Sequence, residues 1–475
     1  MMAIRLSLFA VLLSFMACTK APEVKLISST DKNPWVEKEL AKPSADDLPQ
    51  VVVNIDTNKQ EQTITGFGGC FNEMGWEALN MVTPEEKQQL LNDLFNSETG
   101  CKFNLCRMPV GANDYAVDWY SHNETEGDFA MANFSIDRDR QRLVPYIKEA
   151  QKINPEIRVW ASPWCPPSWM KHNKHYACRA DANQNDLAPE LSSTEELVSR
   201  FITEPEYFQA YALYFSKFVK AYAGEGIKIE AVHVQNEPNS AQNFPSCVWK
   251  PQDLGILIAD YLAPQFQKDS IDAEIWLGTV ERPQIERVDD VLQYKNTMDY
   301  VKGVGFQWAG KGAIESVHAK YPDMQLMQTE TECGDGSNDW KAAEYTFSLM
   351  KHYFENGTNA YMYWNMILDE TGKSQWGWKQ NSMISIDSNT KKIKYNPEFY
   401  LMKHLSAFVQ PGNVKLAADG DTGNVLVFFD EAAQQVIVLA YNEKDENSLL
   451  TLNINNKPVQ TELIAKSFNT LVVSI

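Results

Sequence analysis

The sequence predicts an α/β protein built on a (β/α)8 barrel, or TIM barrel, with an accessory antiparallel β-sandwich. Between residues 66 and 396, short apolar runs rich in β-branched residues alternate with segments of helical periodicity, and eight such repeats close into a barrel. From about residue 397, short strand-like runs recur at regular spacing between turn residues, which is typical of a sandwich. A doubly wound open sheet is disfavoured because no glycine-rich phosphate loop follows any of the runs.

The barrel strands are predicted from apolar runs that end at polar or turn residues. They lie at residues 64–70, 103–110, 157–164, 229–237, 274–280, 301–308, 326–330 and 359–365. Helices are predicted at 138–152, 206–223 and 340–355. A further helix should begin at Pro84, because Thr83 and Glu86 have the spacing of a capping box. The first strand is broken by glycines, which permit close approach of a neighbouring backbone.

The sandwich is predicted from two separate parts of the chain. Its carboxyl-terminal strands are expected at residues 424–429, 435–441, 448–454, 461–465 and 470–474. The run at 51–55 should pair back onto them, because a sandwich needs its edges covered. The sequence therefore predicts residues 49–65 and 397–475 as the sandwich and 66–396 as the barrel.

The amino terminus predicts an export signal. Residues 1–17 contain one arginine and a short apolar core, and Ala17 precedes Cys18, as at the lipoprotein cleavage site of bacteria. Residues 18–48 are then a lipidated cysteine and a tether, since they lack a sustained apolar period. We expect an exported bacterial lipoprotein, periplasmic or at the cell surface, that meets the membrane only through its lipid anchor.

Composition narrows the possible partners. The 475 residues carry a net charge of −20, which disfavours nucleic acid and anionic membranes and is compatible with a neutral substrate. The cysteines show no CxxC pair and the histidines no HExxH motif, so we expect neither a metal nor another cofactor. We expect a monomer, and the sequence does not give the cysteine pairing.

Two acidic residues end two of the predicted strands. Glu237 closes the run 229–237 and Glu330 the run 326–330. Either acid alone could cap a helix or form a surface ion pair, but together they indicate glycoside hydrolysis. In that reaction one carboxyl group protonates the leaving oxygen, and the other attacks the anomeric carbon or activates water. Glu332 competes with Glu330 because residues two apart share a strand face, although it lies beyond the continuous run.

Six short motifs follow one another along the chain. They are residues 66–69, Arg107-Met108-Pro109, residues 161–171, Asn236-Glu237-Pro238, Thr329-Glu330 and Trp364-Asn365. Over roughly residues 62–408 this order resembles the family 30 glycoside hydrolases, which include glucosylceramidases and β-1,6-glucanases. The resemblance implies a (β/α)8 barrel with a side β-sandwich and retaining chemistry. It also implies Glu237 as acid/base and Glu330 as nucleophile.

Departures from the family bear on the substrate. Glucosylceramidases carry a histidine where this chain has Gln307, and Cys101, Cys106 and the loop after Asp114 are not their pattern. Asp114 still matches the aspartate that family members direct at a sugar hydroxyl. Residues 328–336 look more like those of bacterial and fungal β-1,6-glucanases, which favours a glucan substrate.

Further site residues follow from their chemistry. Arg107 could donate a fork of hydrogen bonds to the nucleophile or to a sugar and keep the carboxylate ionised. Asn236 is expected to bond the sugar 2-hydroxyl. Rings for the pocket could come from Trp164, Trp169, Trp308, Trp364, Trp376 and Trp378, with core packing as the alternative for each. We assign Trp164, Trp308, Trp364 and Trp376 to the substrate site, together with Gln307.

The function that these observations favour is a retaining, exported endo-β-1,6-glucanase. A glucosylceramidase-like enzyme and an exo-acting β-glucosidase are alternatives within the hydrolases, because endo or exo action depends on loops that the sequence does not define. A lipoprotein that only binds glycans is the alternative from another class. The presence of both acids argues against it.

Overall fold

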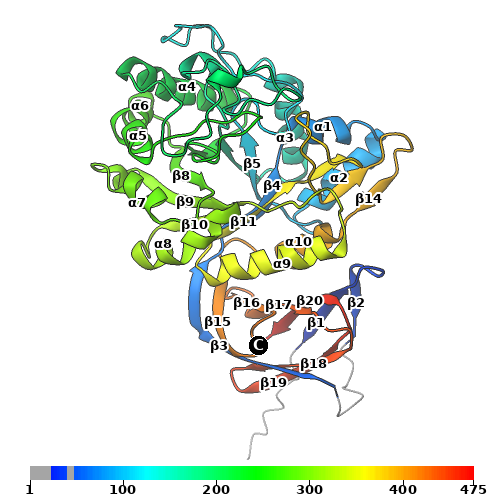
Figure 1. The fold of residues 1–475 in the computed structure, drawn as a ribbon. Helices are drawn as coiled ribbons and strands as arrows, with labels where there is room; N and C mark the ends of the chain where they lie inside the picture. The colour runs from blue at the N-terminus through cyan, green and yellow to red at the C-terminus, as the bar shows by residue number, and fades with distance from the viewer. Residues whose placement is uncertain (1–22, 40–47) are drawn as a thin grey trace, which may run out of the picture.

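Eight parallel strands form a closed barrel in the computed structural model, which describes residues 23–39 and 48–475 (Figure 1). Their order around the barrel follows the chain, and β11 closes the ring by pairing with β4. The predicted TIM barrel is therefore confirmed. The strands are β4 (Gly66–Cys70), β5 (Leu105–Pro109), β6 (Arg158–Ser162), β7 (Ile229–His233), β8 (Glu274–Val280), β9 (Val301–Gln307), β10 (Gln325–Glu330) and β11 (Ala360–Asn365).

Helices cover the outside of the barrel (Figure 1). The predicted capping box is present at the start of α2, where Thr83 and Glu86 exchange hydrogen bonds. Between α5 and α6 a π-helical turn, Leu257–Leu262, continues the same helix. The α-helices are α1 (Glu73–Leu79), α2 (Pro84–Phe95), α3 (Leu143–Ile153), α4 (Pro205–Gly224), α5 (Pro251–Ile256), α6 (Ala263–Asp269), α7 (Glu286–Leu292), α8 (Ile314–Lys320), α9 (Trp340–Glu355) and α10 (Pro397–Ser406).

Side chains fill the interior of the barrel. His233 lies between the rings of Trp160 and Trp276, with ring centroids 4.1 and 5.1 Å away. At the first strand, a Cβ on Gly68 would lie 1.9 Å from the Leu105 carbonyl oxygen, so this position accepts only glycine. The filled interior leaves the carboxyl ends of the strands as the place for a site.

The second unit is a nine-stranded sheet in the order β19-β18-β3-β15-β16-β17-β20-β1-β2. Apolar side chains from eight of these strands, all except β2, pack into one interior, so the sheet curls around a single core as a sandwich. The predicted return of the run at 51–55 is confirmed, because β3 pairs with β15 and β18. The β3–β18 pair is parallel, whereas we expected antiparallel pairing. The strands are β1 (Val24–Ser29), β2 (Val36–Lys38), β3 (Gln50–Thr63), β15 (Val414–Gly420), β16 (Val425–Asp430), β17 (Gln435–Asn442), β18 (Ser448–Ile454), β19 (Lys457–Leu463) and β20 (Ser467–Ser474).

The prediction of a tether over residues 18–48 is wrong for residues 24–38. β1 pairs with β20 along its whole length, and Leu26 is buried in the sandwich core. The run is short and ends in serines, so its apolar pattern is weak, and long-range pairing with the end of the chain determines its structure. The predicted signal peptide, residues 1–17, and Cys18 lie outside the described residues.

Helices α9 and α10 lie between the barrel and the sheet (Figure 1). Phe347 of α9 contacts Phe468 of β20, and His404 of α10 is 2.7 Å from the Ser29 hydroxyl of β1. Leu401 and Leu405 of α10 pack into a hydrophobic core that contains barrel residues and also Phe428 and Leu439 of the sheet. Helix α10, which follows the predicted boundary at residue 396, therefore packs within the core that the two units share.

A small three-stranded sheet holds a loop that lines the cleft at the carboxyl end of the barrel. It consists of β12 (Ile367–Asp369), β13 (Ile384–Ile386) and β14 (Ile393–Tyr395), which the sequence analysis did not predict. The loop between β12 and β13 contains Trp378 and Gln380. β12 follows directly after β11, so this loop begins at the carboxyl end of the barrel.

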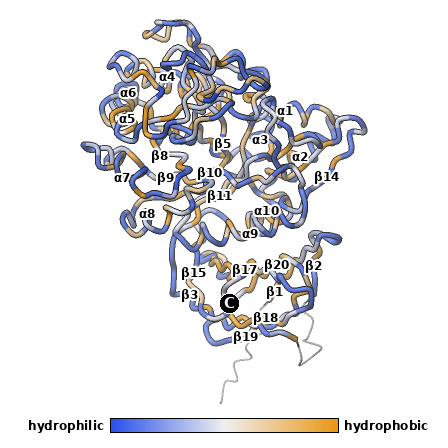
Figure 2. Tube along the Cα trace, in the orientation of Figure 1, coloured by the Kyte–Doolittle hydropathy of each residue, from blue (hydrophilic) through white to orange (hydrophobic). Residues whose placement is uncertain are grey.

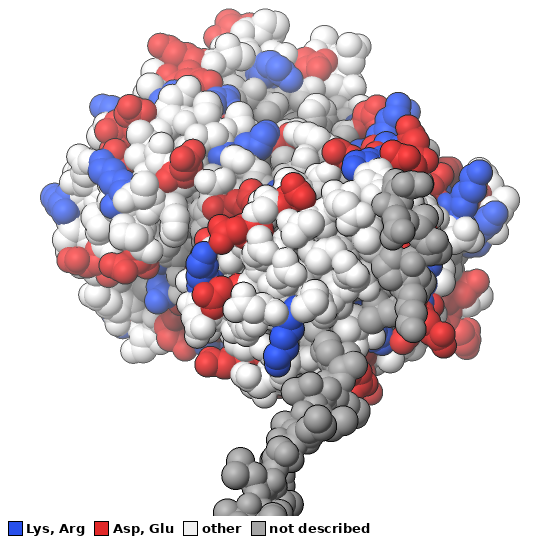
Figure 3. All heavy atoms as spheres, turned by 90° about the horizontal axis from the view of Figure 1, so that it is seen from below, with Lys and Arg blue, Asp and Glu red and all other residues white. Residues whose placement is uncertain are grey.

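Hydrophobic segments lie mainly along the inner strands, whereas hydrophilic segments follow the outer loops (Figure 2). Seen from the sheet side, acidic side chains form clusters with basic side chains scattered among them (Figure 3). Within residues 23–39 and 48–475, no helix is long and apolar enough to cross a bilayer.

Candidate active site

A cleft of about 450 Å³ opens at the carboxyl ends of the barrel strands. Both predicted acids, Glu237 and Glu330, line it. The other lining residues are Asp114, Trp164, Asn236, Ser240, Gln242, Phe244, Glu281, Arg282, Trp308, Ala309, Lys311, Glu332, Trp378 and Gln380. The cleft thus combines aromatic rings with several carboxyl groups, a lining that suits a ligand with apolar faces and hydroxyl groups.

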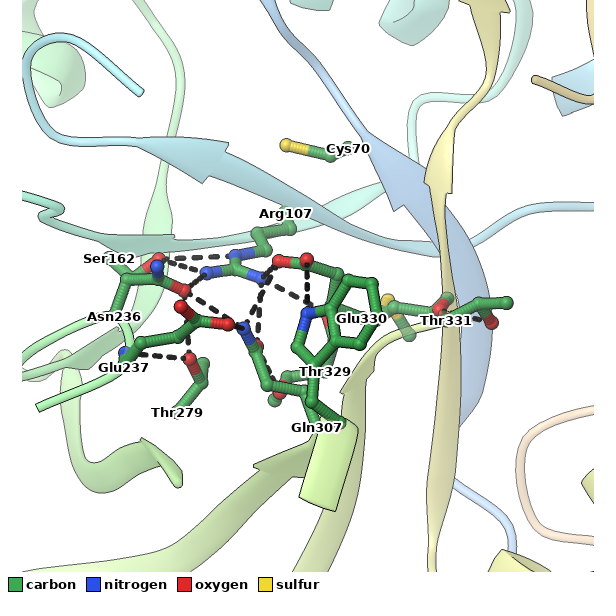
Figure 4. A network of polar contacts seen from close by, with 12 residues as sticks. Cys70, Arg107, Ser162, Asn236, Glu237, Thr279, Gln307, Thr329, Glu330 and Thr331 are labelled. Atoms are coloured by element: carbon green, nitrogen blue, oxygen red, sulfur yellow. Dashed lines mark hydrogen bonds and ion pairs between the residues drawn. The ribbon is translucent and has the colours of Figure 1, made fainter. Parts of the chain in front are cut away.

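Arg107 of β5 organises the floor of the cleft (Figure 4). Its side chain is fully buried, and its Nη1 donates to Glu330 Oε2 at 2.9 Å. The other face of the fork donates to Ser162 Oγ and to Asn236 Oδ1, at 3.0 and 2.7 Å from Nη2. Of the two roles proposed from sequence, the structure supports the contact with the candidate nucleophile, since Arg107 does not line the cleft.

Gln307, the last residue of β9, joins the two acids. Its Nε2 lies 3.1 Å from Glu237 Oε1 and 3.3 Å from Glu330 Oε2. A donor shared by both acids brings these two carboxylate oxygens close together. Such proximity is compatible with the roughly 5 to 5.5 Å between the carboxyl groups of a retaining pair. Gln307 is itself fully buried and does not line the cleft.

The backbone presents Glu237 in an unusual conformation. β7 ends at His233, and not at Glu237 as predicted, because the chain beyond it pairs irregularly with β8. Glu237 has a φ of +48°, a left-handed conformation that a non-glycine residue adopts only when its surroundings enforce it. Its N–H donates to the Thr279 carbonyl oxygen at 3.1 Å. Trp308, which donates to Glu330, has the same φ of +48°.

Asn236 has its oxygen engaged by three donors. Its Oδ1 accepts hydrogen bonds from Arg107 Nη2, Thr279 Oγ1 and Gln307 Nε2, at 2.7, 2.9 and 3.2 Å. The amide nitrogen therefore remains available for a ligand in the cleft that Asn236 lines. A donor beside the acid pair suits a sugar hydroxyl.

The two acids differ in the hydrogen-bond donors that contact them. Glu330 accepts from the charged guanidinium of Arg107 and from the indole N–H of Trp308, at 2.9 and 3.1 Å. Glu237 accepts hydrogen bonds from the neutral side-chain amides of Gln307 and Gln242. Burial raises the pKa of both carboxyl groups, that of Glu330 to about 8, and the charge of Arg107 lowers it at both. The direct hydrogen bond from the charged guanidinium favours the ionised form of Glu330, whereas Glu237 has no charged donor in direct contact.

Asp114 lies in the same cleft, as predicted. It is 4% exposed, and burial, followed by the charge of Glu237, raises its pKa to about 7. Its Oδ1 has no hydrogen-bond partner among the described residues. A buried oxygen without a partner in a sugar-sized cleft is suited to accept a bond from a hydroxyl group.

Glu332, the competitor of Glu330, is bound elsewhere. Its Oε1 lies 2.5 Å from Lys311 Nζ, and its Oε2 accepts from the Tyr345 hydroxyl at 2.7 Å. These contacts direct Glu332 to the wall of the cleft, away from Arg107. The geometry thus favours Glu330 as the partner of Glu237.

The predicted tryptophans divide into three groups. Trp164 and Trp308 line the cleft, whereas Trp364 lies beneath it, 5.4 Å from Trp164 and 5.0 Å from the Arg107 guanidinium. Trp376 does not line the cleft and packs against Trp119 instead. Trp378, which is 42% exposed, provides the ring at the rim instead.

Some residues of the site are not predicted from the sequence. Ser162 accepts from Arg107, Thr279 donates to Asn236, and Glu281 adds a further carboxyl group to the cleft. Ser162 lies within the motif at residues 161–171, so its position at a strand end was a usable signal. Thr279 lies in β8 and Glu281 directly follows it, and this strand carries no recognised motif.

Metal-binding side chains are not grouped in the part of the chain that the structure covers: no cluster there of three or more His, Cys, Asp or Glu could hold an ion. The seven cysteines of that part are buried and free.

The barrel matches a known family of protein domains. The model of the glycosyl hydrolase family 30 TIM-barrel domain matches residues 64–409. The lysosomal acid glucosylceramidase of Mus musculus is 25% identical, covering 85% of this chain and 78% of that protein. The endo-1,6-beta-D-glucanase neg1 of Aspergillus fumigatus is also 25% identical, covering 80% and 77%.

Solved structures show the same fold. The endo-beta1,6-glucanase BT3312 matches with a TM-score of 0.80 and 23% identity, covering 94% of this chain and 98% of that one. SrfJ from Salmonella typhimurium matches with a TM-score of 0.82 and 21% identity, covering 94% and 99%. Because the family model spans the whole barrel and most of the chain, this protein belongs to glycosyl hydrolase family 30.

Proposed function

We propose that the protein is a retaining β-glycoside hydrolase whose substrate is a β-1,6-glucan, with Glu330 as nucleophile and Glu237 as acid/base. The observation that carries the proposal is the shared contact of both acids with Gln307 Nε2, at 3.1 and 3.3 Å. A shared donor suits the closely spaced carboxyl groups of a retaining pair better than the wider pair of an inverting enzyme, which has to admit a water. A site that only binds glycans has no need for this pairing.

The reaction follows from the two environments. Glu330, held as an anion by Arg107, attacks the anomeric carbon while Glu237 gives its proton to the leaving glycosidic oxygen. Glu237, now ionised, then takes a proton from water, which displaces Glu330 from the glycosyl-enzyme. Both displacements invert the anomeric centre, so the released sugar keeps its β-configuration.

The choice of β-1,6-glucan is supported by relatives and by sequence. Proteins with the name endo-1,6-beta-D-glucanase, from Aspergillus fumigatus, Neurospora crassa and Trichoderma harzianum, are 25%, 23% and 25% identical to this chain. Residues 328–336 resemble that group, and Gln307 stands where glucosylceramidases carry histidine. The second candidate, glucosylceramide, is favoured by the 25% identity with the mouse enzyme.

Digestion of a linear β-1,6-glucan, with sizing of the early products, tests the proposal. A ladder of oligosaccharides is expected for endo action, and glucose alone for exo action. Release of ceramide from glucosylceramide without cleavage of the glucan would support the second candidate. No cleavage of either substrate, or of any aryl β-glucoside, would contradict the proposed function.

We also propose that the protein is exported and lipidated at Cys18, and that it acts as a monomer. The support is the apolar run that ends at Ala17-Cys18. Mass spectrometry of native material should find a mature chain that begins with a lipid-modified Cys18. A mature chain that begins elsewhere, or a stable oligomer in light scattering, would contradict this part of the proposal.

A further inference from the structure

Glu281 is a buried carboxyl group that lines the same cleft as the two acids. It directly follows β8 and is 1% exposed. Its Oε1 accepts from the Asn239 N–H at 2.8 Å and from the Ser240 hydroxyl at 2.9 Å. The reaction described above gives this residue no role, although burying a carboxylate costs free energy that its hydrogen bonds have to offset.

We infer that Glu281 is a positioning residue for Glu237: it holds the turn that presents the acid/base, and its negative charge keeps the catalytic proton on Glu237. The inference rests on the proposed function, and it adds Glu281 as the residue that sets the position and the protonation of Glu237. Glu281 acts through Glu237 and needs no contact with the substrate.

The positioning role follows from the turn at residues 237–240. Glu237 is in the left-handed region, and the turn is closed by a bond of 3.0 Å from the Ser240 N–H to the Glu237 carbonyl oxygen. Glu281 binds the last two residues of this turn, Asn239 and Ser240, from the neighbouring strand end. An unfavourable φ persists only where surrounding contacts enforce it, and these two hydrogen bonds are such contacts.

The charge role follows from the donors around Glu281. The Asn239 N–H and the Ser240 hydroxyl both favour the anion, and Arg282 Nη1 is 3.6 Å from Glu281 Oε1. Burial and the charge of Glu237 raise the pKa of Glu281 to about 7. Since charge repulsion is reciprocal, an ionised Glu281 raises the pKa of Glu237 in turn.

Arg282 influences the protonation of both Glu237 and Glu281. It lowers the pKa of Glu237, yet it is also paired with Glu281 and with Glu196, whose Oε1 is 2.9 Å from its Nε. Without the negative charge of Glu281, the positive charge of Arg282 would lower the pKa of Glu237 further, and Glu237 would lose its proton at a lower pH. The other charged groups that face the two carboxyl groups, or line the cleft with them, are Arg107 on β5, Asp114 after β5, Lys311 after β9, Glu330 on β10 and Glu332 after β10.

The experiment compares leaving groups as well as pH. Glu281→Gln keeps an acceptor for the turn and removes the charge, whereas Glu281→Ala removes both. An activated aryl β-glucoside, such as the 2,4-dinitrophenyl glucoside, departs without a proton, but an unactivated phenyl glucoside needs one from Glu237.

For Glu281→Gln we expect the alkaline limb of kcat/KM on the phenyl glucoside to move down by roughly one pH unit. For Glu281→Ala we expect kcat/KM on that substrate to fall by about tenfold or more, with little change on the dinitrophenyl glucoside. Glu73→Gln is the matched control, because Glu73 is equally buried but is bound to Arg138 away from the cleft. It should leave the pH profile unchanged.

Two results would overturn the inference. If the Glu281 variants fold and keep the wild-type pH profile, or lose activity equally on both glucosides, Glu281 has no role in controlling the acid. The proposed function would then still stand. If the wild-type enzyme hydrolyses neither glucoside nor the glucan, the proposed function fails and the inference fails with it.

Discussion

The Arg107 guanidinium is completely buried and lies 2.9 Å from Glu330 Oε2. A buried arginine needs a partner for its charge, and Glu330 is the carboxylate that its geometry provides. The same arginine binds Ser162 and Asn236, so it fixes the relative positions of three strand ends. One residue thus places its charge against the proposed nucleophile and links the strand ends that shape the site.

Arg107→Lys should lower kcat/KM by about 10²-fold or more, because lysine keeps the charge but loses the planar fork that holds Glu330 and Asn236. Steady-state kinetics on an aryl β-glucoside measure this loss. Arg140→Lys, at an exposed ion pair with Glu225, is the control and should be close to wild type. Equal activity in the two variants would contradict the role given to Arg107.

Trp378→Ala should raise KM for the glucan about 5–10-fold with little change in melting temperature, since Trp378 is a half-exposed ring at the cleft rim. Trp376→Ala should instead lower the melting temperature, because removal of a buried indole costs about 3–5 kcal/mol. Calorimetry and kinetics on both variants test this division. The opposite pattern would restore Trp376 to the substrate site.

Glu398 should make the protein less stable as the pH rises. Burial raises its pKa from 4.5 to about 7, so between these pH values the folded state binds more protons than the unfolded state, and the free energy of unfolding falls with increasing pH. Glu398→Gln should therefore reduce the difference in melting temperature between pH 4.5 and pH 8. Glu85→Gln, at an exposed position of α2, should leave that difference unchanged. An unaltered difference in Glu398→Gln would show that this carboxyl group titrates normally.

Glu332→Gln should keep turnover within about tenfold of wild type, because Glu332 is bound to Lys311 and Tyr345 and not to the arginine floor. Kinetics on the activated glucoside measure it. A loss as large as that of Glu330→Ala would move the nucleophile to Glu332.

The barrel and most of the site could be predicted because their signals are local. Each barrel strand comes from a short apolar run, and Asn236, Glu237 and Glu330 lie at or shortly after the ends of two such runs. The structure confirms their convergence on one cleft.

What the sequence could not give depends on contacts between distant segments. β1 looked like a tether, since its partner, β20, lies at the other end of the chain. Trp376 and Trp378 are two residues apart with similar surroundings in sequence, and only the fold of their loop decides which ring is exposed. Glu281 has no motif, and its position beside Glu237 arises from the pairing of two strand ends.

The anomeric configuration of the rescued product tests the central assignment most directly. Glu330→Ala, incubated with azide and an activated β-glucoside, should regain turnover and give the α-glycosyl azide, because azide enters the space that the nucleophile has left. Glu237→Ala should regain turnover with azide as the β-product, since its covalent intermediate still forms. If Glu330→Ala keeps near-normal turnover, or if its rescued product has the β-configuration, the roles given to Glu330 and Glu237 are wrong.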